Sequence, residues 1–219
     1  MLIGHYSASL AGRRAAPSVP LWAWIGAAQL LDILWCVFIM LGIERVAPAP
    51  HVTEGLAFLD YPWSHSLAAA AVWAGVTTQL ARRAFGVPPR AATLLGLVVL
   101  SHWPLDWIVH RPDLLLAPGV GPEMGLGLWD HAAIELAVEI VLFLAAGLWL
   151  RSLWRSQRRR LWPLSLFLLF GAAAFAGMRA AAPPTEIEPV LIGAMGLTLY
   201  LGFVLLAWIA ERASLVPPR

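Results

Sequence analysis

The chain alternates long apolar stretches with short polar connections, and the apolar stretches have the length of membrane-spanning helices. A helix needs about twenty mostly apolar residues to cross the hydrocarbon core of a bilayer. The hydrophobic share of 60% and the mean hydropathy of +0.73 leave little sequence for a soluble domain. We therefore predict an all-α polytopic membrane protein, a single integral membrane domain over residues 1–219. Its six-transmembrane-helix bundle has predicted spans at residues 21–43, 64–81, 91–109, 131–150, 161–180 and 189–210.

Charged residues are divided unevenly among the connections that six spans would create. Every basic side chain is an arginine, and most lie near the chain ends or at alternate connections: Arg13, Arg14, Arg82, Arg83, Arg90, Arg151, Arg155, Arg158, Arg159, Arg160, Arg212 and Arg219. The positive-inside rule then predicts that both termini are cytoplasmic, in a bacterial inner membrane, and the even number of spans agrees. Because these arginines adjoin the spans, contact with anionic membrane lipids explains them better than nucleic acid does. We expect lipids as partners and no nucleic acid.

The two ends of the chain have different expected roles. Residues 2–12 are predicted to form a short helix that lies on the inner leaflet or re-enters it. Residues 1–150 contain the ionisable groups that fall within spans, so these helices are expected to carry the site. Residues 151–219 are expected to supply two supporting helices, because residues 161–178 and 189–210 carry no ionisable side chain.

Ionisable side chains recur within two of the predicted spans at helical spacing. Residues four apart share one face of a helix. Ionisable groups inside a bilayer are costly and usually functional. Since the two spans run in opposite directions, the paired positions fall at matching depths, and we expect them to converge on one cavity open to the outer side. The residues are His102, Asp106 and His110 in the third span, and His131, Glu135 and Glu139 in the fourth.

Two other spans contribute single ionisable residues that need a partner. Asp32 lies near the middle of the first span, where a charged carboxylate without a partner would be strongly disfavoured. His65 lies at the start of the second span, between two serines. Pro104 is predicted to kink the third span, because it cannot donate a hydrogen bond to the carbonyl of Leu100.

Histidine with carboxylate at this spacing is typical of a site for zinc or a similar divalent ion. The strongest local signal is the pair His102 and Asp106, with His65 and Asp32 as further ligands from other spans. Glu135 or Glu139 is then the predicted general base, and His110 and His131 are further candidates. The alternative is a His–Asp hydrogen bond that only holds helices together. His51, in a proline-rich connection, is expected to be solvated.

Several short motifs, taken in order, resemble a known family. Gly4-His5, Asp32, Trp63-Ser64-His65-Ser66-Leu67 and Ser101-His102-x-x-x-Asp106 are similar to the pattern of the bacterial inner-membrane family of membrane-bound metal-dependent hydrolases. The resemblance covers residues 1–140. Ser64 stands where the family more often has threonine, and the Asp32 region lacks a paired Asp-x-Asp. The resemblance implies the metal ligands His5, Asp32, His65, His102 and Asp106, and His5 can take part only if residues 1–12 re-enter the membrane.

Three functions follow from these predictions. The leading hypothesis is an intramembrane metal-dependent hydrolase that acts on an ester or phosphoester, lipid-linked because the site lies within the bilayer. A metal-ion or proton-coupled transporter is the main alternative, because ladders of ionisable residues also relay protons or ions. A haem-binding redox protein with His65 and His102 as axial ligands is the third, although the carboxylates favour a harder ion.

Overall fold

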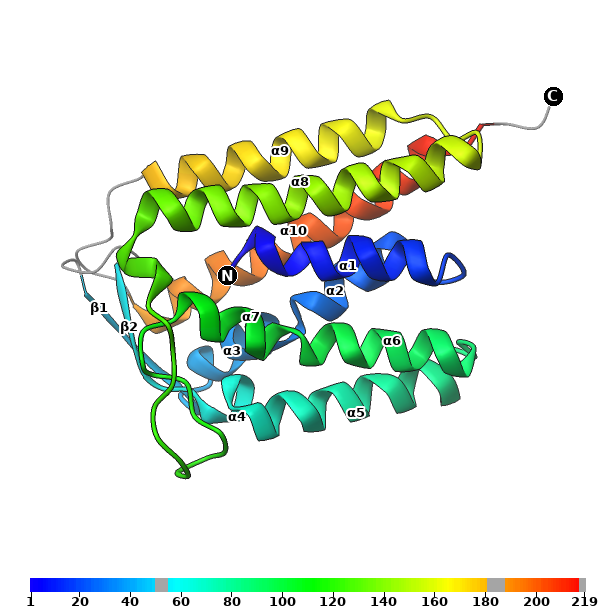
Figure 1. Ribbon diagram of the computed structural model, residues 1–219. Helices are drawn as coiled ribbons and strands as arrows, with labels where there is room; N and C mark the ends of the chain where they lie inside the picture. The colour runs from blue at the N-terminus through cyan, green and yellow to red at the C-terminus, as the bar shows by residue number, and fades with distance from the viewer. Residues whose placement is uncertain (50–54, 181–187, 217–219) are drawn as a thin grey trace.

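Helices make up most of the protein, and the long ones lie side by side in one bundle (Figure 1). The computed structural model describes residues 1–49, 55–180 and 188–216. Its helices are α1 (Ile3–Ala15), α2 (Leu21–Ala28), α3 (Leu30–Met40), α4 (Pro62–His65), α5 (Leu67–Arg83), α6 (Pro89–Leu100), α7 (His102–Val109), η1 (Leu128–Asp130), α8 (Ala132–Ser156), α9 (Trp162–Ala180) and α10 (Pro189–Ser214).

Four stretches of the described chain are long and apolar enough to cross a membrane: α6 with α7, α8, α9 and α10. Helices α2 and α3 make a fifth only if taken together, and they are bent by 54° where they meet. The predicted single span over residues 21–43 is therefore a broken one. The predicted second span is α5, which has 17 residues and a polar second half that includes Thr77, Thr78 and Gln79. Its length and composition do not indicate a span, so the count of six is not confirmed.

The predicted N-terminal helix is present, and it lies inside the bundle rather than along its surface. Helix α1 packs against α8 and α2, with Ile3, Tyr6 and Leu10 fully buried. Helix α1 runs from the middle of the bundle to one end, and α2 runs back from that end toward the middle (Figure 1). Met1 is buried beside Asp106. The charge pattern placed the N-terminus at the arginine-rich end, where the structure has the α1–α2 connection instead.

Close packing and a buried ion pair hold α1 and α2 in place. A Cβ added at Gly12 would lie 2.5 Å from Trp24 Cε3, so only glycine allows α1 and α2 to approach this closely. Arg13 lies 2.6 Å from Glu211 of α10, and the other oxygen of Glu211 accepts the backbone N–H of Leu21 at 2.7 Å. One carboxylate thus fixes both helices to α10.

The connection over residues 44–63 contains a small sheet that the sequence analysis did not predict. Strands β1 (Arg45–Pro48) and β2 (Leu56–Asp60) pair antiparallel, with Val46 opposite Phe58. The all-α expectation is wrong at this point. The prolines in this segment indicated an irregular loop, but a two-stranded edge tolerates proline where no ladder hydrogen bond is needed.

Regular helix in the third span is interrupted close to the predicted kink, although Pro89–Val109 still form one apolar stretch of 21 residues. Helix α6 ends at Leu100 and α7 begins at His102, two residues before Pro104. Because Pro104 has no N–H, the carbonyl of Leu100 loses its helical partner and the two helices separate at Ser101.

The two ends of the bundle differ in what they carry (Figure 1). The β-strands and the long connection between α7 and α8 lie at one end, which we call the hairpin end. The α1–α2, α5–α6 and α8–α9 connections lie at the other, the arginine-rich end. The backbone N–H groups of Leu67 and Ala68 donate to the carbonyls of Leu115 and Leu116, so the connection after α7 folds over the start of α5.

Candidate metal centre

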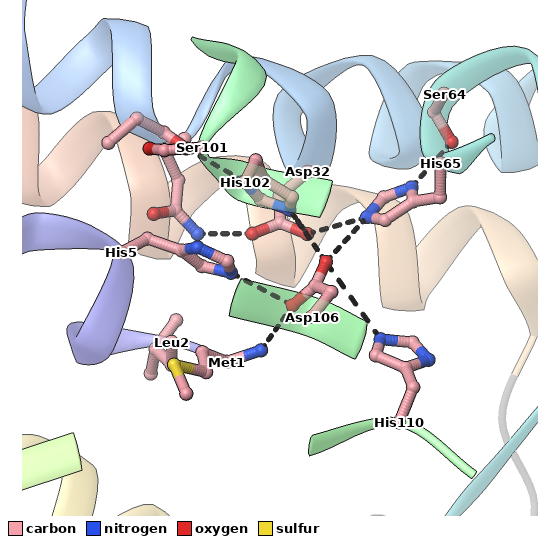
Figure 2. A network of polar contacts seen from close by, with 12 residues as sticks. Met1, Leu2, His5, Asp32, Ser64, His65, Ser101, His102, Asp106 and His110 are labelled. Atoms are coloured by element: carbon pink, nitrogen blue, oxygen red, sulfur yellow. Dashed lines mark hydrogen bonds and ion pairs between the residues drawn. The ribbon is translucent and has the colours of Figure 1, made fainter. Parts of the chain in front are cut away.

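Five ionisable side chains from four helices meet in the interior near the hairpin end (Figure 2). They are His5 of α1, Asp32 of α3, His65 of α4, and His102 and Asp106 of α7. None is more than 9% exposed. These are the five residues that the family resemblance implied as ligands, and the structure brings all of them together. The spacing of His102 and Asp106 puts both on the same face of α7.

Asp106 lies at the centre of the cluster. Its Oδ1 atom is 3.0 Å from His5 Nε2 and 2.5 Å from the α-amino nitrogen of Met1. Its Oδ2 atom is 3.0 Å from His102 Nε2, 3.7 Å from His65 Nε2 and 4.0 Å from His110 Nε2. Each histidine therefore presents the same ring nitrogen, Nε2, to this carboxylate.

Asp32 faces Asp106 across the two central histidines. Its Oδ1 atom is 3.2 Å from His65 Nε2 and 3.6 Å from His102 Nε2, and Gln29 donates a hydrogen bond to Oδ2. Two overlapping groups of potential ligand atoms result, His5 with Asp32 and His102, and His65 with His102 and Asp106. Within each group the ligand atoms lie within 4.8 Å of one another. His102 belongs to both groups and also stacks on the ring of His5, with centroids 3.7 Å apart.

The backbone of α2 fixes the tautomer of His102. Its Nδ1 atom lies 2.8 Å from the carbonyl oxygen of Ala28, which can only accept, so Nδ1 carries the proton. Ala28 is the last residue of α2, next to the bend before α3. Nε2 is then directed into the cluster, where a neutral ring would offer a lone pair to a metal ion. Although Nε2 lies 3.0 Å from Asp106 Oδ2, it has no hydrogen-bond partner, because the angle is wrong for one.

A chain of hydrogen bonds fixes His65 in the same way. Glu44 accepts the backbone N–H groups of Trp63 and Ser64 at 2.8 Å, and the hydroxyl of Ser64 donates to its other oxygen at 2.6 Å. Because the hydroxyl of Ser64 donates its only proton to Glu44, it accepts a hydrogen bond from Nδ1 of His65, at 2.7 Å. Burial raises the pKa of Glu44, and the three donors oppose that shift.

His65 and His102 thus both donate from Nδ1 and turn Nε2 toward carboxylate oxygens; Nε2 of His65 is within hydrogen-bond distance of Asp32, whereas Nε2 of His102 has no hydrogen-bond partner. A ring nitrogen that faces a carboxylate is stable there only with a cation between the two, either a proton on the ring or a metal ion. A buried polar atom without a partner calls for an explanation, such as a bound ion. Metal-binding histidines typically donate their other ring N–H, here at Nδ1, to a carbonyl, carboxylate or similar acceptor. The donor set and its arrangement fit a divalent metal ion.

The other two predicted histidines lie in different surroundings. His110 is buried, with Nδ1 2.9 Å from Asp113 Oδ1 and its ring 4.0 Å from that of Trp129. Burial lowers the pKa of His110, and the contact with Asp113 opposes that shift. His131 is exposed at the start of α8, away from the cluster. His51 lies outside the described residues.

The two predicted general bases lie beside α1. Glu139 accepts the backbone N–H groups of Leu2 and Gly4 at 2.8 and 3.0 Å, and so holds the start of the helix that carries His5. Glu135 lies one turn earlier on α8, 3.1 Å from Arg179 of α9. The structure therefore gives Glu139 an orienting contact, and the general-base role of either residue stays a prediction.

Sequence reasoning missed Glu44 and the carbonyl of Ala28. Glu44 is not part of any motif, and it is 20 residues from Ser64 in sequence. Nothing in the local pattern joins the two, because the β1–β2 hairpin lies between them. Ser64 itself entered the sequence analysis only as part of the short motif around His65.

A small polar pocket of about 70 Å³ leads from the hairpin end to His65. Tyr61 and Ser66 form part of its wall, and three carboxylates, those of Asp60, Asp113 and Glu123, line it as well. Burial raises the pKa of the Tyr61 phenol, and its hydroxyl donates to Asp113 at 2.7 Å. The pocket gives the cluster a connection to the surface at this end.

Comparison of the chain with protein-family models, curated proteins and solved structures found no match. The resemblance to membrane-bound metal-dependent hydrolases therefore stays a prediction.

Proposed function

We propose that the five-residue cluster holds a divalent metal ion and that the protein is an intramembrane metal-dependent hydrolase of esters or phosphoesters. The observation that carries the proposal is the pair of Nε2 atoms of His65 and His102, both held toward the same two carboxylates, with no hydrogen-bond partner for His102 Nε2. A cluster held together by protons alone would give each of these nitrogens a hydrogen bond; His65 Nε2 has one to Asp32, but His102 Nε2 has none.

The chemistry of the ligand set favours zinc or a similar ion. Imidazole and carboxylate together suit borderline divalent metals. Such an ion polarises an ester or phosphoryl oxygen and acidifies water bound to it. The chain's own contribution is to hold the ligands rigidly: Ala28 and Ser64 fix the two central imidazoles, and Glu139 fixes the helix that brings His5.

The surroundings of the cluster support a lipid-linked substrate. The ligands lie among helices whose outer faces are apolar, and the pocket beside His65 opens at the hairpin end. A lipid-linked substrate would place its apolar part among the helices and its ester or phosphoester group near His65. This end is the predicted outer side of the membrane.

Haem is a poorer fit to this geometry. The rings of His65 and His102 lie 5.2 Å apart, and their Nε2 atoms both face Asp32 and Asp106 rather than each other across an apolar slot. A macrocycle needs its axial ligands on opposite faces of one plane.

The transporter alternative rests on one observation, the three carboxylates that line the pocket and would attract a cation. A transporter also needs a polar route to the arginine-rich end. The large groove there, described below, is lined almost wholly by apolar residues. This arrangement favours a site that is reached from one side.

Elemental analysis of the purified protein tests the metal. We expect the wild type to retain stoichiometric divalent metal and His102→Ala to lose it, because His102 belongs to both ligand groups. The matched control is His131→Ala, which removes an exposed histidine of the same chain. Equal metal content in wild type and His102→Ala would refute the metal site.

The hydrolase is tested separately. The metal-loaded protein is assayed against nitrophenyl esters, nitrophenyl phosphates and phospholipids in micelles, with His102→Ala as the inactive control. In parallel, proteoliposomes are assayed for uptake of the metal. Uptake without hydrolysis would support the transporter and overturn the hydrolase, while leaving the metal centre intact.

A further inference from the structure

A large apolar groove lies at the arginine-rich end, away from the metal cluster. Its volume is about 700 Å³, and its walls come from the α1–α2 connection, α2, α3, α5, the α5–α6 connection, α6 and α10. Among its lining residues, Ser18 and Thr77 carry hydroxyls and none is charged. The groove shares no lining residue with the five-residue cluster.

The groove opens onto the surface that faces the predicted bilayer. Val76 and Leu80 of α5 and Leu201 of α10 line it, and each is at least 40% exposed. Phe85, in the α5–α6 connection, lines the same groove and is 78% exposed. An apolar hollow of this kind, with lipid rather than water outside it, has the chemistry of an acyl-chain site.

Three arginines flank the mouth of the groove. Arg82 and Arg83 lie between the groove residues Ala81 and Phe85, and Arg90 follows Pro88 by two residues. All three are exposed. Within the part of the chain that the structure describes, none of them has an ion-pair or cation–π partner.

Some other arginines at this end do have partners, whereas Arg151, Arg155, Arg158 and Arg160 likewise have no ion-pair or cation–π partner among the described residues but do not adjoin the groove. Arg13 and Arg159 share Glu211, and the guanidinium groups of Arg14 and Arg212 lie over tryptophan rings at 4.9 and 4.5 Å. Unpaired guanidinium groups beside an apolar hollow complement a phosphate that is attached to a hydrocarbon chain.

We propose that this groove binds one acyl chain of an anionic phospholipid, whose phosphate lies on Arg82, Arg83 and Arg90. The site is independent of the metal cluster and of the proposed hydrolase. It gives the protein a fixed lipid at the arginine-rich end, whatever substrate the metal centre takes.

Retained lipid tests the proposal. The full-length protein is purified from micelles that contain equal phosphatidylglycerol and phosphatidylcholine, and bound lipid is counted by native mass spectrometry. We expect the wild type to retain phosphatidylglycerol in preference to phosphatidylcholine. Near the membrane surface each arginine contributes about fivefold to binding of an anionic lipid, so removing all three by Arg→Gln should abolish the preference. Equal retention of the two lipids by the wild type would overturn the proposal.

A second variant blocks the groove itself. A Cβ at Gly26 meets only Val204 Cγ2, at 3.7 Å, so Gly26→Phe can fold and place its ring in the groove. We expect this variant to lose bound lipid of both kinds while its metal content stays unchanged. Lipid retention equal to that of the wild type would place the lipid elsewhere and overturn the acyl site.

Matched controls separate the groove from general effects of charge and size. Gly75→Phe adds the same ring on α5, where a Cβ would meet no atom within 4 Å and which does not line the groove. Replacing Arg151, Arg155 and Arg160 by glutamine removes the same charge from the α8–α9 region at the same end. Both controls should retain phosphatidylglycerol as the wild type does. If the arginine control loses the preference as fully as the mouth variant, the arginines act through net charge and the phosphate site is wrong.

Discussion

The position of one proton on each imidazole determines what His65 and His102 can do. Both rings have their Nδ1 proton held by an acceptor, a serine hydroxyl in one case and a backbone carbonyl in the other. Only Nε2 is then left to face Asp32 and Asp106. A histidine free to change tautomer would spend part of its time with a proton at the position that a metal ion needs.

The first prediction concerns Ser64. In Ser64→Ala the Nδ1 proton of His65 loses its acceptor, and the link to Glu44 is broken. Loss of such an outer contact typically lowers metal affinity by ~10–100-fold. Competition with a chelator of known affinity measures the change.

Ser64→Thr is the control, because it keeps the hydroxyl, and it should bind metal within a few-fold of wild type. Thermal unfolding in micelles, followed for both variants without metal, shows whether Ser64→Ala folds normally. A folded Ser64→Ala variant with wild-type affinity would show that the Glu44–Ser64–His65 chain is irrelevant to the metal.

The sequence predicted the ligand residues more completely than the groups that hold those ligands in place. His102 and Asp106 follow from helical spacing, and His5 and Asp32 from the order of short motifs. Glu44 could not be found, because its contact with Ser64 depends on how a hairpin of unpredicted structure returns the chain. The carbonyl of Ala28 is a backbone atom and leaves no mark in the residue pattern.

Helix α1 is fixed at both ends by carboxylates from other helices. Glu139 of α8 accepts two backbone N–H groups at its start, and Glu211 of α10 pairs with Arg13 near its end. Helix N-termini carry unsatisfied N–H groups and partial positive charge, which a carboxylate neutralises. The position of His5 in the cluster depends on these contacts.

The second prediction separates two roles for Glu139. Glu139→Gln keeps an oxygen that can accept from Leu2 and Gly4, so metal affinity should stay close to wild type. Glu139→Ala removes the acceptor, frees the start of α1, and should lower metal affinity by ~10-fold or more. Chelator competition measures both.

Turnover by Glu139→Gln then tests the predicted base. If Glu139 is the base, this variant binds metal normally and loses hydrolysis, because an amide cannot take up a proton. Glu135→Gln provides the parallel measurement one helical turn away. Normal turnover in both variants would leave α8 as a support and remove both residues from the catalytic step.

The third prediction concerns the far end of α1. Glu211→Ala leaves Arg13 buried without its carboxylate and leaves the N–H of Leu21 unpaired. Removing one partner of a buried ion pair costs about 3 kcal/mol or more. Thermal unfolding in micelles should show a clear loss of stability.

An exposed ion pair in the same chain is the matched comparison. Arg45 and Asp60 lie 3.5 Å apart, and their side chains are 69% and 47% exposed. Asp60→Ala should cost less than about 1 kcal/mol. Equal losses in the two variants would mean that the pair of Arg13 with Glu211 does not anchor α1.

At the level of elements, prediction succeeded where one stretch is continuously apolar. The stretches that became α8, α9 and α10 are long apolar runs, and each was expected as one helix. The first predicted span looks equally continuous, yet it bends between α2 and α3. Its periodicity gives no warning of the bend, next to which the carbonyl of Ala28 accepts from His102. Strand β2 was not predicted, because the prolines near it are typical of irregular connections.

The fourth prediction concerns the whole molecule in its membrane. The long connection after α7 and the α5–α6 connection lie at opposite ends of the bundle (Figure 1). The split of arginines predicts that the first faces outward. Val120→Cys, at a position 60% exposed, should therefore react in intact cells with a reagent that cannot cross the membrane.

Phe85→Cys, at a position 78% exposed, is the partner measurement at the arginine-rich end. It should react only after the cells are opened. The native Cys36 is buried, so it contributes little background. Labelling of residue 120 only from the cytoplasmic side would reverse the orientation and turn the pocket beside His65 toward the cell interior.

The contact of α1 with Glu139 also determines when the centre can form during synthesis. Leu2 and Glu139 are 137 residues apart, and chains emerge from the ribosome N-terminus first. A nascent chain that has reached the end of α7 already carries all five ligands. It still lacks α8, against which α1 packs and whose carboxylate holds the start of that helix. Metal capture is therefore expected to wait for α8 to enter the membrane, so that possessing the ligands and possessing the site are separate stages of biogenesis.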